Sequence, residues 1–81
     1  MKEKIIEKLE ALEPTVIQIQ DVSHLHKGHS GWREGGETHF ELVISSEKFN
    51  NLTKVKSHQL IYKVLEEEMK QIHALQIELK Y

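Results

Sequence analysis

Cysteine is absent from the chain, and so are long apolar runs. Without cysteine there is no disulfide, no thiolate metal site and no cysteine nucleophile, which suits a protein of a reducing compartment. The longest apolar runs, such as Leu42-Val43-Ile44, contain three residues, far fewer than a transmembrane helix needs. The first residues, Met1 to Ile6, lack the apolar stretch of a secretory signal. We therefore expect a cytoplasmic protein without a membrane segment.

A large charge of one sign is absent as well. Eleven Lys and Arg residues against thirteen Asp and Glu leave a formal net charge of −2, whereas a domain that binds nucleic acid indiscriminately is normally basic. The chain contains no internal repeat, no low-complexity tract and no linker. Because 81 residues are near the lower end of what one core stabilises without disulfides, residues 1–81 are predicted to form a single domain.

Glycine and tryptophan are few, and they lie together. Residues 21–39 contain every glycine (Gly28, Gly31, Gly35 and Gly36), the only tryptophan (Trp32) and four of the six histidines (His24, His26, His29 and His39). A small domain normally distributes its glycines among several turns. Their concentration predicts one long loop, and long irregular loops in compact domains are usually functional or disordered. This loop is the first candidate for a functional site.

Alternation and helical periodicity predict the remaining elements. They are a helix over 2–12, strands over 15–20, 39–45 and 73–79, a helical turn over 46–49 capped by Ser46, and a helix over 54–71 capped by Thr53. The loop thus connects a β-hairpin, and it is far longer than a tight turn needs. The last helix is a crossover that allows the second and third strands to pair in parallel. The predicted fold is α+β, a two-layer sandwich in the order α-β-β-α-α-β.

Histidine carries the metal hypothesis. His24 and His26 are two positions apart, which in extended chain places both rings on one side, and His29 follows. Neutral imidazole is the commonest metal ligand in proteins, and the alternative is a solvated polar loop. His73 begins the predicted last strand on the same inward face as Leu75. For His73 the alternative to a metal ligand is a half-buried histidine with a backbone partner.

Two patterns concern nucleic acid. Residues 28–31 have the GxxG form that clamps a nucleic-acid backbone in KH domains, but that loop joins two helices and this one joins two predicted strands, so we reject the match. Lys48, Lys54, Lys56 and His58 gather around the start of the long helix, where the helix dipole disfavours cations. They are candidate nucleic-acid contacts, and the alternative is a solvated lysine patch.

No catalytic set is evident. Ser30 lies near His29 and Glu34, and Ser57 precedes His58, but neither group has a third orienting residue or an oxyanion cradle. Adjacent helical residues such as Ser57 and His58 also point apart. The glycine-rich loop lacks the Lys-Ser/Thr ending of a phosphate-binding loop. The sequence therefore predicts a protein that is not an enzyme.

Three segments together carry a resemblance to a known family. They are Gly28-His29-Ser30-Gly31 with Gly36-Glu37-Thr38-His39-Phe40 and the strand to Ser45, then Ser46-Glu47-Lys48-Phe49 to Ser57-His58-Gln59-Leu60-Ile61-Tyr62, then Leu65-Glu66-Glu67-Glu68-Met69 with Ile72-His73-Ala74-Leu75. Each motif alone is modest. In this order and spacing they extend along nearly the whole chain, and they resemble the BolA family.

The resemblance implies a class II KH-like α/β domain with a three-stranded mixed sheet. It also implies that the chain pairs with a monothiol glutaredoxin and shares a bridging [2Fe-2S] cluster in iron–sulfur cluster trafficking or iron sensing. The glutaredoxin side contributes a cysteine and glutathione. Carried over to this chain, the ligands are His73 and the loop residue His29, and the isolated domain binds no cluster. Candidates for supporting or alternate ligands are His24, His26 and His39, and Trp32 is a candidate partner contact.

The resemblance also implies an alternative function. Members of the family have been treated as transcriptional regulators that bind DNA through the KH-like face, here with Lys48, Lys54, Lys56 and His58. This chain departs from the usual Arg-His-Arg of the family, because it has Ser57-His58-Gln59 at that place. A weak homodimer stays open as a further alternative.

Overall fold

The computed structural model describes residues 1–28 and 36–80. In chain order the elements are α1 (Lys2–Leu9), η1 (Glu10–Leu12), β1 (Val16–Asp21), η2 (Ser23–His26), β2 (His39–Ser45), η3 (Glu47–Phe49), α2 (Lys54–Val64), α3 (Glu66–Met69) and β3 (Ala74–Leu79). None of the helices in this part of the chain is long and apolar enough to cross a membrane.

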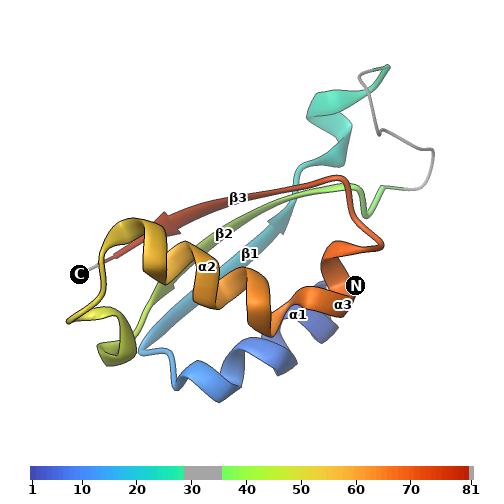
Figure 1. Cartoon of the computed structure of the whole chain (residues 1–81). Coiled ribbons are helices and arrows are strands. Elements are labelled where there is room, and N and C mark those ends of the chain that lie inside the picture. Colours follow the sequence, from blue (N-terminus) through green and yellow to red (C-terminus); the bar gives the residue numbers. More distant parts are fainter. Residues whose placement is uncertain (29–35, 81) are drawn as a thin grey trace.

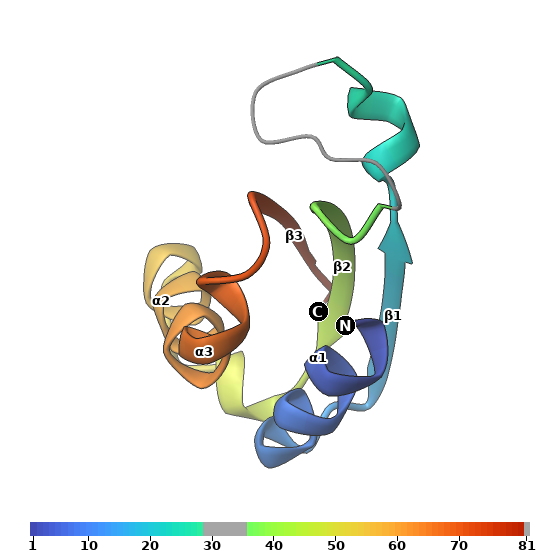
Figure 2. The ribbon, with the colours of Figure 1, turned by 90° about the vertical axis from the view of Figure 1, so that its right-hand side faces the viewer.

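The three strands form one mixed sheet in the order β1-β2-β3 (Figure 1). β1 pairs antiparallel with β2, and β3 pairs parallel with β2, so the predicted crossover between the second and third strands is confirmed. The helices α1 and α2 cover one face of the sheet, and the 3-10 helix η2 that follows β1 lies beyond the end of the sheet (Figure 2). The predicted α+β fold with a mixed three-stranded sheet is thus confirmed.

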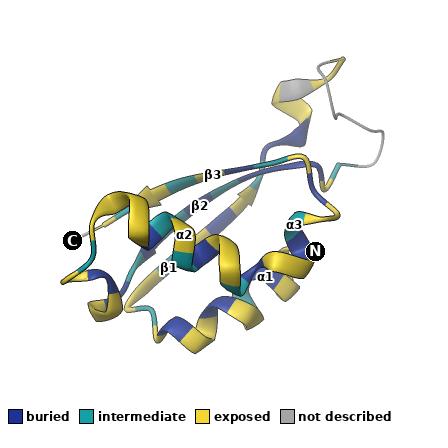
Figure 3. Cartoon of the chain, in the orientation of Figure 1, coloured by how far each residue is buried: buried dark blue, intermediate teal, exposed yellow. Residues whose placement is uncertain are grey.

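The core lies between the sheet and the helices (Figure 3). Phe40, Leu42 and Ile44 alternate along β2 and face the helices as predicted, each at most 2% exposed. Their helical partners include Ile5 and Leu9 on α1. The other buried members of the cluster are Leu12, Ile19, Phe49, Ile61, Leu65, Ile72 and Leu75. Because β2 is the central strand, its apolar face contributes the middle of the core.

The predicted helix caps are confirmed, but the long helix is not continuous. The Thr53 hydroxyl accepts the Lys56 N–H, and the Ser46 hydroxyl accepts the Lys48 N–H, which satisfies first-turn donors that have no partner within the helix. The predicted helix over 54–71 breaks at Leu65, with φ −96° and ψ 18°. No glycine or proline marks the break. Leu65 stays fully buried, so tertiary packing outweighs the helix propensity of the flanking residues.

Candidate functional site

Two histidines meet where β2 and β3 begin. The ring centroids of His39 and His73 lie 5.1 Å apart with the ring planes tilted by 50°. His39 is buried, and its Nδ1 lies 2.7 Å from the Thr38 hydroxyl. His73 is exposed. The structure therefore brings one solvent-facing imidazole against a second, buried one.

The predicted position of His73 was wrong. We expected it within the last strand and facing the core, but β3 begins at Ala74 and His73 is exposed. The reason lies in the backbone: the N–H groups of His73 and Ala74 both donate to the Thr38 carbonyl, at 2.8 and 3.1 Å. A shared acceptor of this kind replaces the regular ladder, in which the hydrogen bonds are evenly spaced. His73 is thus fixed by its backbone while its side chain faces solvent.

The Ser23 hydroxyl holds the start of β2. It is buried, and its Oγ accepts the N–H groups of Thr38 and His39 at 2.9 and 3.0 Å. The Val22 N–H donates to the His39 carbonyl at 2.8 Å. Buried N–H groups need such partners, because an unpaired one costs free energy. Ser23 therefore positions His39 directly, and His73 through the Thr38 carbonyl.

Asp21 completes this arrangement. Its carboxylate accepts the Ser23 N–H at Oδ1 and the Glu37 N–H at Oδ2, both at 2.9 Å. Gly36 has φ +81°, and a Cβ there would lie 3.0 Å from Asp21 Oδ2. Glycine is required on both grounds, since other residues rarely adopt this φ and the carboxylate occupies the space. We call Asp21, Ser23 and Thr38 the loop clamp, because they join the two ends of the β1–β2 connection.

The charge of Asp21 is favoured by its surroundings. Partial burial raises the pKa of its carboxyl group, but hydrogen bonds from the Ser23 side chain and from the Ser23 and Glu37 N–H groups, with the nearby His24, outweigh burial. The pKa of Asp21 therefore lies below its ordinary value of 3.8. Hydrogen bonds to the charged form of a carboxyl group have this effect.

We expect the loop clamp to weaken in acid. A lowered folded-state pKa stabilises the fold at pH values above the unfolded pKa of about 3.9, and this contribution is lost as pH falls through the folded value. Asp21→Asn should therefore lower the free energy of unfolding at pH 6, and its difference from the wild type should shrink toward pH 3. Urea unfolding across that range measures the difference. A constant difference, like that of the exposed control Glu10→Gln, would contradict the assignment.

The other predicted loop residues lie apart from the pair formed by His39 and His73 or outside the described residues. His24 and His26 belong to the 3-10 helix η2, so the prediction of extended chain at these two residues was wrong. The helix η2 begins where the Asp21 carboxylate accepts the Ser23 N–H. His24 is exposed. His29 and Trp32, predicted as a ligand and a partner contact, lie outside the described residues. Among the loop histidines whose side chains are described, His24 and His39, the ring of His39 lies next to that of His73.

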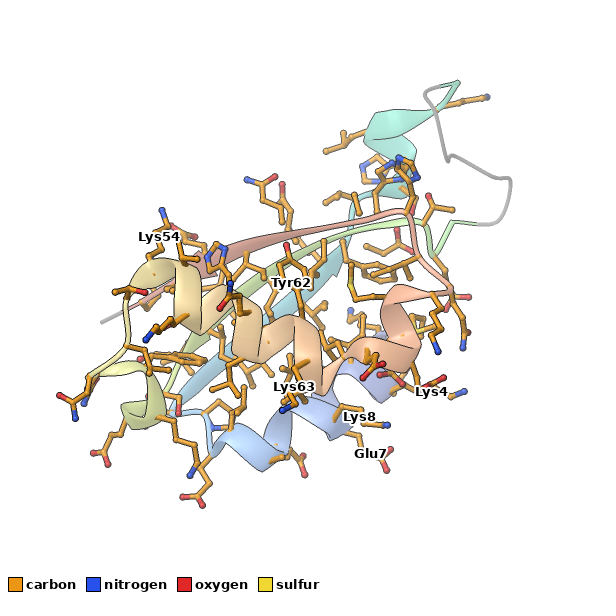
Figure 4. All side chains as sticks on the ribbon, viewed as in Figure 1. Lys4, Glu7, Lys8, Lys54, Tyr62 and Lys63 are labelled. Atoms are coloured by element: carbon orange, nitrogen blue, oxygen red, sulfur yellow. The ribbon has the colours of Figure 1, made fainter. Side chains whose placement is uncertain are left out.

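The predicted nucleic-acid contacts lie apart from this site. Lys48, Lys54 and Lys56 are exposed around the start of α2, and Figure 4 shows Lys54 at its first turn. His58 differs from them, since its Nε2 is buried and has no hydrogen-bond partner among the described residues. The three lysines are thus exposed near the start of α2 in sequence, and the buried Nε2 of His58 does not share their exposure.

Sequence reasoning missed the loop clamp. Asp21 and Ser23 were not singled out, and Thr38 appeared only as part of a motif. An Asp followed two residues later by Ser is a signal for a side-chain-to-backbone turn, and it would have placed η2. Within residues 1–28 and 36–80, no three His, Asp or Glu side chains lie close enough to hold a metal ion. His73 is therefore not part of a three-ligand metal cluster within the described part of the chain.

These features define a small α+β domain whose mixed sheet has helices on one face, with an exposed histidine at the end where β2 and β3 begin. The family model of the BolA-like proteins matches residues 9–81. The chain belongs to the BolA-like protein family. It is 45% identical over 80 residues to SufE-like protein 1, chloroplastic/mitochondrial, of Arabidopsis thaliana. It is 46% identical over 68 residues to the DNA-binding transcriptional regulator BolA of Haemophilus influenzae.

A solved structure supports the fold. The chain matches only part of the length of its sequence relatives. The BolA domain of SufE1 from Arabidopsis thaliana superimposes with a TM-score of 0.84 at 45% identity, covering 96% of this chain and 87% of that one. The sequence matches cover 91% and 83% of this chain but 22% of SufE-like protein 1 and 62% of the Haemophilus protein. The chain thus spans less than two thirds of both relatives.

Proposed function

We propose that the chain is a non-enzymatic adaptor that shares a bridging [2Fe-2S] cluster with a monothiol glutaredoxin, in iron–sulfur cluster trafficking or iron sensing. The observation that carries the proposal is His73, an exposed imidazole whose backbone is fixed to the Thr38 carbonyl. A ligand of this kind is accessible to a partner and already held in place. We also propose a cytoplasmic location, because a chain without cysteine suits a reducing compartment.

The donor set fits a cluster that is shared. The chain has no thiolate, so it offers iron only nitrogen and oxygen ligands, and the partner supplies the cysteine and glutathione. His73 is one ligand, and His29 is the second by family resemblance. Two neutral imidazoles in place of two thiolates on one iron make the cluster less negative and raise its reduction potential. His39 supports His73 from the buried side, where their rings meet.

The test is anaerobic reconstitution of this chain with a monothiol glutaredoxin and glutathione, followed by size-exclusion chromatography and visible circular dichroism. We expect a one-to-one complex with a spectrum different from that of the glutaredoxin alone. The chain alone, treated identically, should show no cluster absorption. A mixture whose spectrum equals the sum of the separate samples would contradict the proposal.

The exposed lysines favour a second candidate function, namely DNA binding. Lys48, Lys54 and Lys56 are exposed and lie near the start of α2 in sequence, and the Haemophilus relative is named as a DNA-binding regulator. Fluorescence anisotropy with duplex DNA at several salt concentrations tests it. For each phosphate that a variant no longer neutralises, the slope of log K against log salt should become shallower by about 0.9. Lys54→Ala with Lys56→Ala should therefore flatten the slope, whereas the control pair Lys4→Ala with Lys63→Ala should not.

A further inference from the structure

None of the described helices or strands covers the face of the sheet opposite the helices, below the site (Figure 2). The strand register aligns its outward side chains in two rows across all three strands. One row is Gln20, Glu41 and Gln76, and the next is Gln18, Val43 and Glu78. We call these six residues the open face. The row above them contains His39 paired with Ala74, so the open face continues directly from the site.

Two shallow depressions flank the central strand on this face. The larger, of about 300 Å³, lies on the β1 side and is lined by Gln18 and Gln20 among others. The smaller, of about 80 Å³, lies on the β3 side and is lined by Gln76 and Glu78 among others. Both are also lined by Glu41 and Val43. A carboxylate next to an apolar side chain thus forms the centre of a hollowed surface.

Glu41 carries a charge that no described residue neutralises. It is half-buried, and its carboxylate forms no hydrogen bond or ion pair with another residue of the described part of the chain. Its neighbours across the sheet, Gln20 and Gln76, are neutral. Removing a carboxylate from water without a partner costs free energy, which a nearby cation offsets.

Three of the lysines lie away from the open face. Lys4 and Lys8 on α1 and Lys63 on α2 belong to the helical side of the molecule (Figure 4). Lys80 follows the open face in sequence, and its Nζ lies 3.7 Å from the carboxylate of Glu78, so it pairs at the edge of this face and not with Glu41. The centre of the open face therefore lacks a cation from the described residues, and its charge is complementary to a basic partner.

We propose that the glutaredoxin docks on the open face and that a lysine or arginine of the glutaredoxin pairs with Glu41. The inference rests on the proposed function, because it names the surface that this partner covers. A protein that shares a cluster at His73 must contact the end of the sheet where β2 and β3 begin. Because the helices cover one face of the sheet, the face that such a partner can reach from this end is the open face. The methylene groups of a lysine or arginine would lie along Val43 while the charged group reaches Glu41. The glutaredoxin is thus the single partner that we place on the open face.

The test uses glutaredoxin without cluster or glutathione, titrated calorimetrically into this chain and its Glu41→Gln variant. We expect the variant to raise Kd about tenfold, because it removes one partner of a largely desolvated charge pair. The difference should shrink as salt rises. Glu41→Lys should raise Kd further. Glu66→Gln, a charge removed from an exposed position on α3, is the control and should bind as the wild type does, and urea unfolding checks that every variant is folded.

Each outcome separates the docking surface from the proposed function. If the wild type shares a cluster with the glutaredoxin but Glu41→Gln and Glu41→Lys bind as tightly as Glu66→Gln, the docking proposal is wrong and the proposed function stands. If the wild type neither binds the glutaredoxin nor shares a cluster, both are wrong. Weaker binding of both Glu41 variants, with Glu66→Gln unchanged, supports the docking surface.

Discussion

His73→Ala is expected to abolish the shared cluster without unfolding the protein. Mutations that only support a metal ligand typically cost about 10- to 100-fold in metal affinity, and loss of the ligand itself should cost at least as much. The fold should be spared, because the His73 side chain is exposed and its N–H donates to the Thr38 carbonyl, a bond that alanine keeps. Visible circular dichroism of the anaerobic complex measures the cluster, and urea unfolding measures the fold.

His24→Ala is the matched control for this prediction. His24 is also exposed and also lies at the loop end of the sheet, so its substitution removes an imidazole of the same kind. Its complex should keep the spectrum of the wild type, a result that would also remove His24 from the candidate supporting or alternate ligands. If His73→Ala and His24→Ala retain the cluster equally well, His73 is not a ligand, and the assignment carried over from the family fails for this chain.

Ser23→Ala is expected to cause the largest loss of stability among changes at the site. The substitution leaves the buried N–H groups of Thr38 and His39 without the hydroxyl that accepts them at 2.9 and 3.0 Å. Each buried donor left unsatisfied costs about 1–3 kcal/mol, so the expected loss for two donors is roughly 2–6 kcal/mol. This is a large share of the total, since domains have about 0.05–0.15 kcal/mol per residue. Urea unfolding measures the loss.

Ser45→Ala tests whether the loss depends on position. Ser45 ends β2 on the face away from the helices and is half-buried, so the same substitution there should change the free energy of unfolding by less than about 0.5 kcal/mol. Hydrogen exchange adds a local measurement, since the Thr38 and His39 amides should exchange faster in Ser23→Ala alone. Equal stability of the two variants would show that the hydroxyl of Ser23 is not what holds the start of β2.

The sequence was sufficient for elements whose signals are local. The strand β2 (His39–Ser45) has the predicted bounds, because apolar residues recur at every second position from Phe40 to Ile44, and only Val43 is apolar on the other face. The caps Thr53 and Ser46 were also predicted correctly, since a hydroxyl that accepts a first-turn N–H acts within three residues of itself. The break at Leu65 was missed because it depends on packing against distant residues, not on a glycine or proline.

The site was harder to predict, because its geometry depends on contacts between distant segments. Ser23 meets Thr38 and His39 across the whole β1–β2 connection, and no local pattern specifies that pairing. The orientation of His73 follows from the Thr38 carbonyl, an acceptor 35 residues earlier in the chain. Alternation alone placed His73 inward with Leu75. The identity of His73 as a functional residue came from the family motif, and its exposure came from the structure.

The most direct test of the central claim is the identity of the atoms that bind iron. This chain is labelled with ¹⁵N at histidine only, combined with unlabelled glutaredoxin and glutathione, and the shared cluster is reduced for pulsed electron paramagnetic resonance. The account predicts ¹⁵N hyperfine coupling from directly bound imidazole in the wild-type complex, and no signal of a shared cluster in His73→Ala. A wild-type complex that holds the cluster without any ¹⁵N coupling would contradict the account.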